Sequence, residues 1–122
     1  MSGQAQASGR PGRSGSVDYE VNLSVAADIA DDYLAWLQAH IAQLLALPGF
    51  LQARLWRVED PAQAGRVDYC VRYRLADARA LDAYLQRHAP AMRQEGLARF
   101  GAAVRAHRRI LRPLPAPPAP QQ

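Results

Sequence analysis

Two segments of the chain alternate strictly between apolar and polar side chains, and the polar rows hold groups able to bind a charged ligand. In residues 17–25 the polar row is Asp18, Glu20, Asn22 and Ser24. In residues 66–75 it is Asp68, Cys70, Arg72 and Arg74. A period of two indicates a strand with one apolar and one polar face. If the two strands are neighbours, both polar rows share one face of a sheet.

These rows support two interpretations. In the first, Arg72 anchors a small anion or carbonyl compound in a polar cavity, and the ligand-binding candidates beside it are Asn22, Cys70 and Arg74. In the second, the acids Asp18 and Glu20 simply pair with the arginines across antiparallel strands, which contributes roughly 0.2–1 kcal/mol per pair. If a second sheet covers this face, such pairing becomes necessary because the charges lose their water.

His107 is the candidate acid–base residue. It lies among arginines in the predicted last strand, and neighbouring positive charge favours a neutral imidazole that can act as a base. Glu20 or Asp18 across the sheet would orient it, with Arg72 as the third candidate catalytic group. The alternative is a histidine on the surface of a strand.

Metal-binding groups are present but poorly spaced. His40, His88, His107 and Cys70 match no ligand pattern such as HxxxH or CxxC, so we predict neither a metal nor a cofactor. Cys70 is the only cysteine, which excludes a disulfide framework. We expect it to act as a small hydrophobic side chain rather than as a nucleophile.

The hydrophobic period changes along the chain in a way that predicts six main elements. The segments are strand 17–25, helix 28–47, strand 50–59, strand 66–75, a second helix starting after Asp77 and broken near Pro90, and strand 103–111. Asp28 and Asp77 are the expected N-caps. After the break, residues 91–100 continue as helix, with Met92, Leu97 and Phe100 turned inward and Gly101 as terminator.

The order β-α-β-β-α-β leaves one dominant arrangement. Right-handed crossovers and short connections predict a ferredoxin-like α+β domain over residues 17–112, with a four-stranded antiparallel sheet and both helices on one face. The first and third strands are then central neighbours. Trp56 lies on the open face if Ala53 and Leu55 point to the core, where it is a candidate interface residue. A bulge would turn it inward instead.

Composition narrows the function classes. The chain has 122 residues and a net charge of +4, and all 15 basic residues are arginine. Arg10 and Arg13 fall in residues 1–16, an arm predicted to be disordered, which leaves +2 on the domain. The polar rows of the two predicted central strands lack the aromatic side chains that stack bases in RNA-binding sheets, so we expect no nucleic acid. No apolar run approaches the ~18–20 residues of a membrane span, and no secretory signal is visible, so we expect a cytoplasmic protein.

Six stretches of the chain carry a resemblance to a known family: YEVNLSV (19–25), DYLAWLQAHIAQLL (32–45), GF (49–50), YCVRY (69–73), LDAYLQRHAPAMRQEGLARFG (81–101) and RRIL (108–111). They resemble a small bacterial family of uncharacterised domains, similar to the dimeric α/β-barrel superfamily. The APxxRxxGLxRFG pattern is the most specific part. The resemblance implies two sheets closing face to face into a barrel, and it implies no activity. Superfamily relatives include cofactor-free monooxygenases, isomerases and stress-response modules, but none of their catalytic motifs transfers to this chain.

Three functions follow as hypotheses. The first is a dimeric, non-enzymatic module that binds a small ligand or acts in a stress response. The second is a cofactor-free enzyme with chemistry in the barrel cavity. The third is an adaptor acting through residues 113–122, a proline-rich tail in which Pro115 and Pro118 fit a PxxP spacing. A simple disordered tail is the alternative to the third.

Overall fold

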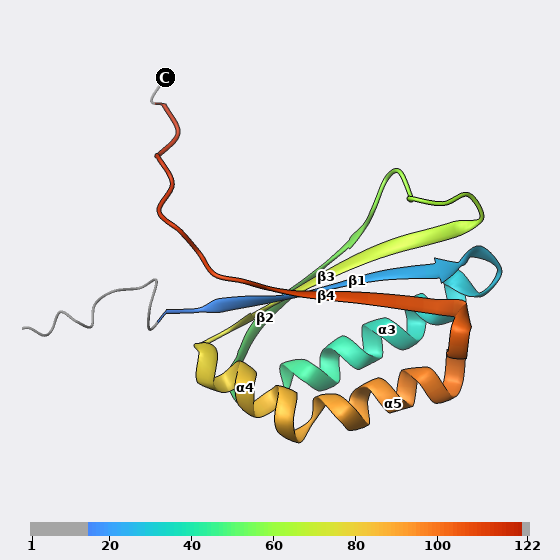
Figure 1. Ribbon diagram of the computed structural model, residues 1–122, viewed down its shortest axis with the longest axis horizontal. Helices are drawn as coiled ribbons and strands as arrows, with labels where there is room; N and C mark the ends of the chain where they lie inside the picture. Colours follow the sequence, from blue (N-terminus) through green and yellow to red (C-terminus); the bar gives the residue numbers. More distant parts are fainter. Residues whose placement is uncertain (1–14, 121–122) are drawn as a thin grey trace, which may run out of the picture.

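The computed structural model describes residues 15–120, and its helices and strands follow the predicted order (Figure 1). The elements are β1 (Val17–Ala26), α3 (Ala30–Leu45), β2 (Phe50–Arg57), β3 (Arg66–Leu75), α4 (Ala78–Arg87), α5 (Ala89–Phe100) and β4 (Val104–Leu111). Short 3-10 turns at Ala27–Ile29 and Gly101–Ala103 lead into α3 and β4. Of the predicted disordered arm, residues 1–14 lie outside the described residues.

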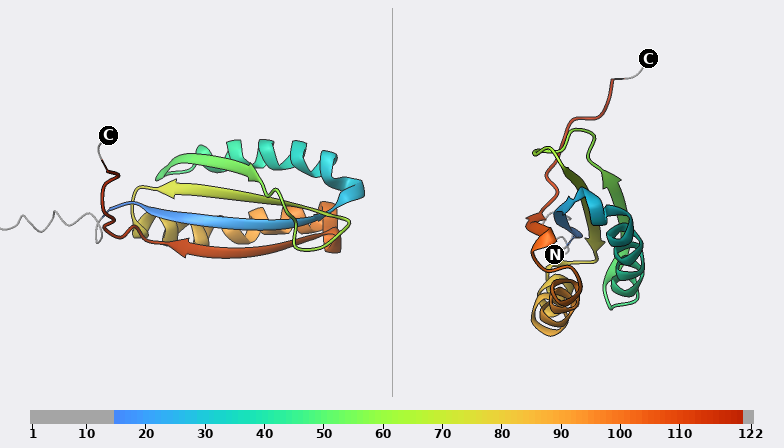
Figure 2. Two further views of the ribbon diagram at one scale, coloured as in Figure 1. Left: turned by 90° about the horizontal axis from the view of Figure 1, so that it is seen from above. Right: turned by 90° about the vertical axis from the view of Figure 1, so that its right-hand side faces the viewer.

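The strands form one antiparallel sheet in the order β2-β3-β1-β4, and the helices cover one of its faces (Figure 2). This is the ferredoxin-like βαββαβ fold that the sequence predicts. β1 and β3 are central neighbours, as expected, and β2 and β4 are the edges. We call the face without helices the open face.

The register puts the two predicted polar rows together on the open face. Asp18 is paired with Arg74, Glu20 with Arg72, and Asn22 with Cys70. On the other side of β1, Glu20 is paired with Arg109 and Asn22 with His107. Each acid of β1 therefore has an arginine beside it on the same face of the sheet.

The core lies between the sheet and the helices. Val25, Val71 and Leu75, from the apolar rows of β1 and β3, are completely buried. The helices cover this surface with their own buried side chains, which are Ala30, Tyr33, Leu37, Leu44, Leu81, Tyr84 and Ala89. Because each strand alternates and each helix is amphipathic, one contiguous apolar layer forms on this side of the sheet only.

The helix starts and breaks were predicted with mixed success. Asp77 caps α4, since its side chain accepts a hydrogen bond from the backbone N–H of Ala80 at 2.9 Å. Asp28 was wrong as a cap: it lies within the 3-10 turn, and α3 begins after Ile29, which makes no side-chain cap bond. The tight turn is needed because the chain must reverse directly after β1. The break at Pro90 is confirmed, with Pro90 in the first turn of α5.

The sequence left two orientations open for Trp56 and predicted that Leu97 points inward. Trp56 lies opposite Cys70 on the open face and is 40% exposed. β2 does contain a bulge, but it falls between Phe50 and Gln52 and leaves Trp56 outside. Leu97 faces the space between α3, α5 and the sheet, as predicted, but it is 60% exposed rather than buried.

After β4 the chain leaves the sheet on the side away from the helices (Figure 1). Residues 112–120 contain neither helix nor strand. Within residues 15–120, none of the helices combines the length and the apolar character needed to cross a bilayer.

Candidate functional site

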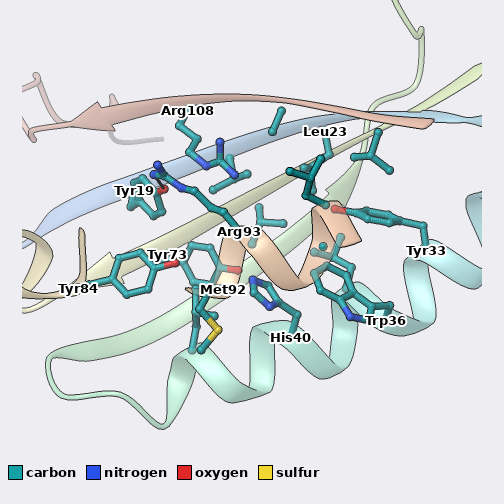
Figure 3. A pocket seen from close by; sticks show the side chains of 18 of the residues that line it. Tyr19, Leu23, Tyr33, Trp36, His40, Tyr73, Tyr84, Met92, Arg93 and Arg108 are labelled. Carbon is teal, nitrogen blue, oxygen red and sulfur yellow. Dashed lines mark hydrogen bonds between the residues drawn. The ribbon is translucent and has the colours of Figure 1, made fainter. Parts of the chain in front are cut away.

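A cavity of about 260 Å³ lies between the sheet and the two longer helices, α3 and α5 (Figure 3). We call it the helix–sheet cavity. Its wall is rich in aromatic side chains, namely Tyr19, Tyr33, Trp36, Tyr73 and Tyr84. The sheet contributes small apolar residues between them, such as Val21 and Val71. The cavity can therefore accommodate an apolar, flat molecule.

The two helices are held apart by aromatic contacts at one end of the cavity. Tyr33 of α3 meets Phe100 of α5 edge to face, with ring centroids 4.9 Å apart. Trp36 reaches α5 at Gly96, where an added Cβ would lie 3.1 Å from the indole ring. The aromatic rings thus act as spacers between α3 and α5, and Gly96 gives the indole the room it needs.

His40 is the histidine of this cavity. Its ring stacks on Trp36, with centroids 4.7 Å apart and the planes 15° from parallel. Its Nδ1 is buried and has no hydrogen-bond partner within residues 15–120. Burial lowers the pKa of the imidazole, with an opposing effect from Glu95 and a further lowering by Arg108. His40 is therefore a neutral imidazole able to exchange a hydrogen bond or a proton with a bound molecule.

Three tyrosines of the cavity, Tyr33, Tyr73 and Tyr84, are neutral phenols. Burial raises the pKa of Tyr33 and of Tyr84 to about 12, although Arg108 opposes this effect at both. Burial raises the pKa of Tyr73 further still. At neutral pH these side chains offer apolar ring faces and uncharged hydroxyl groups.

Two arginines complete the wall. Arg93 of α5 donates a hydrogen bond to the Tyr19 hydroxyl at 3.0 Å. Arg108 of β4 is paired with Val21, so it lies on the helix-covered face of the sheet rather than on the open face. Figure 3 shows both side chains reaching into the region between β4 and α5.

On the open face, Glu20 is the centre of a network of charged groups. Arg72 and Arg109 form ion pairs with its carboxylate, at 2.8 and 2.6 Å, and Asn22 donates a hydrogen bond at 2.9 Å. Burial by itself would raise the pKa of this carboxyl, but the hydrogen bonds and Arg109 outweigh it and lower the pKa to about 2. Asp18 and Arg74 form a separate ion pair at 3.1 Å.

The remaining candidates also lie on the open face. His107 lies opposite Asn22, not opposite Glu20 or Asp18, and within residues 15–120 neither acid accepts a hydrogen bond from it. His107 and Asn22 line a second, more open cavity of about 210 Å³. Cys70 is half-buried, and burial raises the pKa of its thiol. The part of the chain that the structure describes has no group of three or more His, Cys, Asp or Glu side chains placed to bind a metal.

The ligand-binding and catalytic candidates from the sequence therefore lie on the open face, while the larger cavity lies on the other face. Arg93, Arg108 and the aromatic wall were missed, and His40 was considered only as a metal ligand. One signal was available: Arg108 occupies the row of β4 that otherwise holds Val104, Ala106 and Ile110. A charged residue in an apolar row marks a position that does not pack into an ordinary core.

Solved structures with this fold are similar in shape but distant in sequence. SnoaB, a cofactor-independent oxygenase from Streptomyces nogalater, has 18% identity and a TM-score of 0.58, covering 86% of this chain and 99% of that one. A Caulobacter crescentus protein assigned to the antibiotic biosynthesis monooxygenases has 18% identity and a TM-score of 0.63, covering 84% and 92%. A similarly assigned protein from Deinococcus radiodurans has 20% identity and a TM-score of 0.60, covering 86% and 99%.

At these identities the likeness establishes the fold alone. A comparison with curated proteins finds none that matches this chain. The family is established by a sequence model that matches residues 16–114, which include every helix and strand of the structure. The chain belongs to the family described as Domain of unknown function (DUF4286).

Proposed function

We propose that this protein binds a small aromatic molecule in the helix–sheet cavity. The observation that carries the proposal is the buried Nδ1 of His40, a polar atom without a partner in the wall of an otherwise aromatic cavity. Buried polar atoms almost always have a hydrogen-bond partner, and a bound molecule would supply one here.

The size of the cavity limits the ligand. A cavity of roughly 150 Å³ is enough for benzene, whereas drug-sized ligands occupy pockets of roughly 300–1,000 Å³. At about 260 Å³, the helix–sheet cavity fits one or two aromatic rings with small substituents. Larger polycyclic molecules would require α3 and α5 to move apart.

Filling the cavity tests this function. Val21→Phe adds a ring at the cavity wall, and we expect it to weaken the binding of naphthalene-sized probes at least tenfold in isothermal titration calorimetry. Val58→Phe is the matched control, because Val58 lines the smaller cavity on the open face. Equal binding by wild type and Val21→Phe, or a loss only in Val58→Phe, would contradict the proposal.

The same site supports an enzymatic function as the second candidate. The neutral imidazole of His40 could remove a proton from a bound phenol or enol. The resulting anion would reduce O₂ directly: a C–H bond of the substrate is replaced by C=O, and the second oxygen atom leaves as water with that hydrogen and the proton taken by His40. The fold shared with a cofactor-independent oxygenase supports this reaction class.

Oxygen consumption in the presence of a bound, ionisable aromatic compound tests this second candidate. We expect turnover to be lost in His40→Ala and kept in His107→Ala. The opposite pattern would instead support chemistry on the open face, where His107, Arg72, Glu20 and Asp18 are the candidates from the sequence. Binding without oxygen consumption would leave the protein a ligand-binding module.

We propose that the open face is the surface through which two copies of this chain form a homodimer. We also propose that the protein resides in the cytoplasm. Trp56 is an exposed aromatic side chain there, with the guanidinium groups of Arg54 and Arg72 lying 5.4 and 5.7 Å from its ring. Aromatic and arginine side chains are enriched at the centres of protein interfaces. Because Glu20 already neutralises part of the arginine charge, two such faces can approach each other.

A further inference from the structure

We propose that the ligand of the helix–sheet cavity is an aromatic carboxylate, with its carboxylate bound by Arg93 and Arg108 and its rings held by the aromatic wall. This inference rests on the proposed function, and it names the chemical class of the ligand. Three features of the cavity carry it: the two arginines, the aromatic interior between the helices, and His40.

The two arginines bring positive charge that nearby acids do not neutralise. Within residues 15–120, the ion pairs formed by arginine involve only Arg72, Arg74 and Arg109, all of which lie on the open face. Arg93 donates instead to the hydroxyl oxygen of Tyr19. Glu95 is the acidic residue whose charge reaches the cavity at His40, and it forms no ion pair with either arginine.

Arg93 and Arg108 belong to different elements, but both side chains face the same part of the helix–sheet cavity. Both line the helix–sheet cavity, and both lower the pKa of the Tyr84 phenol against the effect of its burial. Figure 3 shows the two side chains entering from α5 and β4. Guanidinium groups present paired N–H donors that match the two oxygens of a carboxylate. A carboxylate between them could accept hydrogen bonds from both.

The inner part of the cavity determines the rest of the ligand. Trp36, Tyr73 and Tyr84 offer ring faces and edges that suit a flat apolar group. His40 adds one polar position through its buried Nδ1. A hydroxyl group on the ligand would satisfy this nitrogen in either tautomer, because a hydroxyl can both donate and accept a hydrogen bond. The best-fitting ligand is therefore a hydroxylated aromatic acid.

Calorimetric titration with three probes of one shape tests this class. The probes are 2-naphthoate, its uncharged analogue 2-naphthamide, and 6-hydroxy-2-naphthoate. We expect wild type to bind 2-naphthoate at least tenfold tighter than 2-naphthamide. Arg108→Gln should reduce this preference to less than threefold while the affinity for the amide stays unchanged. His40→Phe should abolish any gain that the added hydroxyl group brings.

Two further variants make the result specific. Arg105→Gln is the control, because Arg105 lies on the open face and bonds to Gln63 at 2.9 Å, so it should bind all three probes like wild type. Arg93→Gln should repeat the effect of Arg108→Gln. Because Arg93 also donates a hydrogen bond to Tyr19, the melting temperature of the Arg93→Gln variant must be measured together with its binding.

The outcomes separate this inference from the proposed function. Equal binding of 2-naphthoate and 2-naphthamide by wild type would overturn the carboxylate class and leave the proposed function intact. A preference that survives in Arg108→Gln and Arg93→Gln, or that disappears in Arg105→Gln, would place the anion elsewhere and overturn the inference. Failure of all three probes to bind wild type would count against both.

Discussion

Glu20 is a carboxylate on the face of the sheet that carries no helices, yet it is only 2% exposed. Burying a carboxylate is costly unless hydrogen bonds replace its water. Arg72 and Arg109 reach the Glu20 carboxylate from the two neighbouring strands. The same two side chains therefore shield the carboxylate from water and donate hydrogen bonds to it. Their own side chains are 41% and 55% exposed, so the network remains in contact with water.

This network predicts a loss of stability in acid. The folded-state pKa of Glu20, about 2, lies below its ordinary value of 4.5, so its contribution is complete above pH 4.5 and is lost as the pH falls toward 2. We expect the stability difference between wild type and Glu20→Gln to shrink by about 2–3 kcal/mol from pH 6 to pH 2. Urea unfolding at several pH values measures it.

Asp18→Asn is the matched control for this prediction. Asp18 also pairs with an arginine across β1 and β3, but the partner Arg74 is about half exposed. Exposed ion pairs contribute roughly 0–1 kcal/mol, so we expect little effect from Asp18→Asn at any pH in this range. A larger effect from Asp18→Asn than from Glu20→Gln would contradict the account of the network.

The sequence predicted the important side chains of the open face better than those of the helix-covered face. The alternation in residues 17–25 and 66–75 placed Glu20 and Arg72 on one face, and the ion pair followed from their opposite charges. His40 gave no such pattern, and Arg108 gave only an interruption of the apolar row of β4. Their importance depends on a cavity between two helices, and the sequence does not define the distance between helices.

At the scale of elements, the two aspartates that precede helices differ in what they contact. Asp77→Ala should lower the free energy of unfolding by about 1 kcal/mol, because it removes the bond to the Ala80 N–H. Asp28→Ala should change stability by less than about 0.5 kcal/mol, since no side-chain cap bond exists at the start of α3. Thermal unfolding of both variants measures the difference, and equal losses would contradict it.

The elements themselves were largely predictable. The strands of residues 17–25 and 66–75 and the break at Pro90 follow from local periodicity and from the geometry of proline. The start of α3 was missed because Asp28 fits a capping pattern in sequence, whereas the chain needs a 3-10 turn after β1. Leu97 faces the helix–sheet cavity as its spacing predicts, but it stays 60% exposed because a cavity, and not packed side chains, lies beside it.

At the scale of the whole molecule, the proposed homodimer predicts a mass of two chains in solution. Trp56→Glu places a carboxylate at the exposed aromatic position of the open face, and we expect it to shift the mass toward that of one chain. Leu45→Glu is the control, because Leu45 is 38% exposed on α3, on the other side of the sheet. Light scattering on a sizing column measures both. Dimers that persist in Trp56→Glu and dissociate in Leu45→Glu would contradict the proposed interface.

The sheet separates the two tryptophans of this chain. Trp36 lies in the wall of the helix–sheet cavity, and Trp56 lies on the open face. Each is therefore an intrinsic optical probe of one event. Trp56→Phe leaves an emission signal that reports ligand entry, and Trp36→Phe leaves one that reports self-association. The strands that line the cavity also form the open face. The two single-tryptophan variants would thus show, without any added label, whether ligand binding in the cavity and self-association are coupled through these strands.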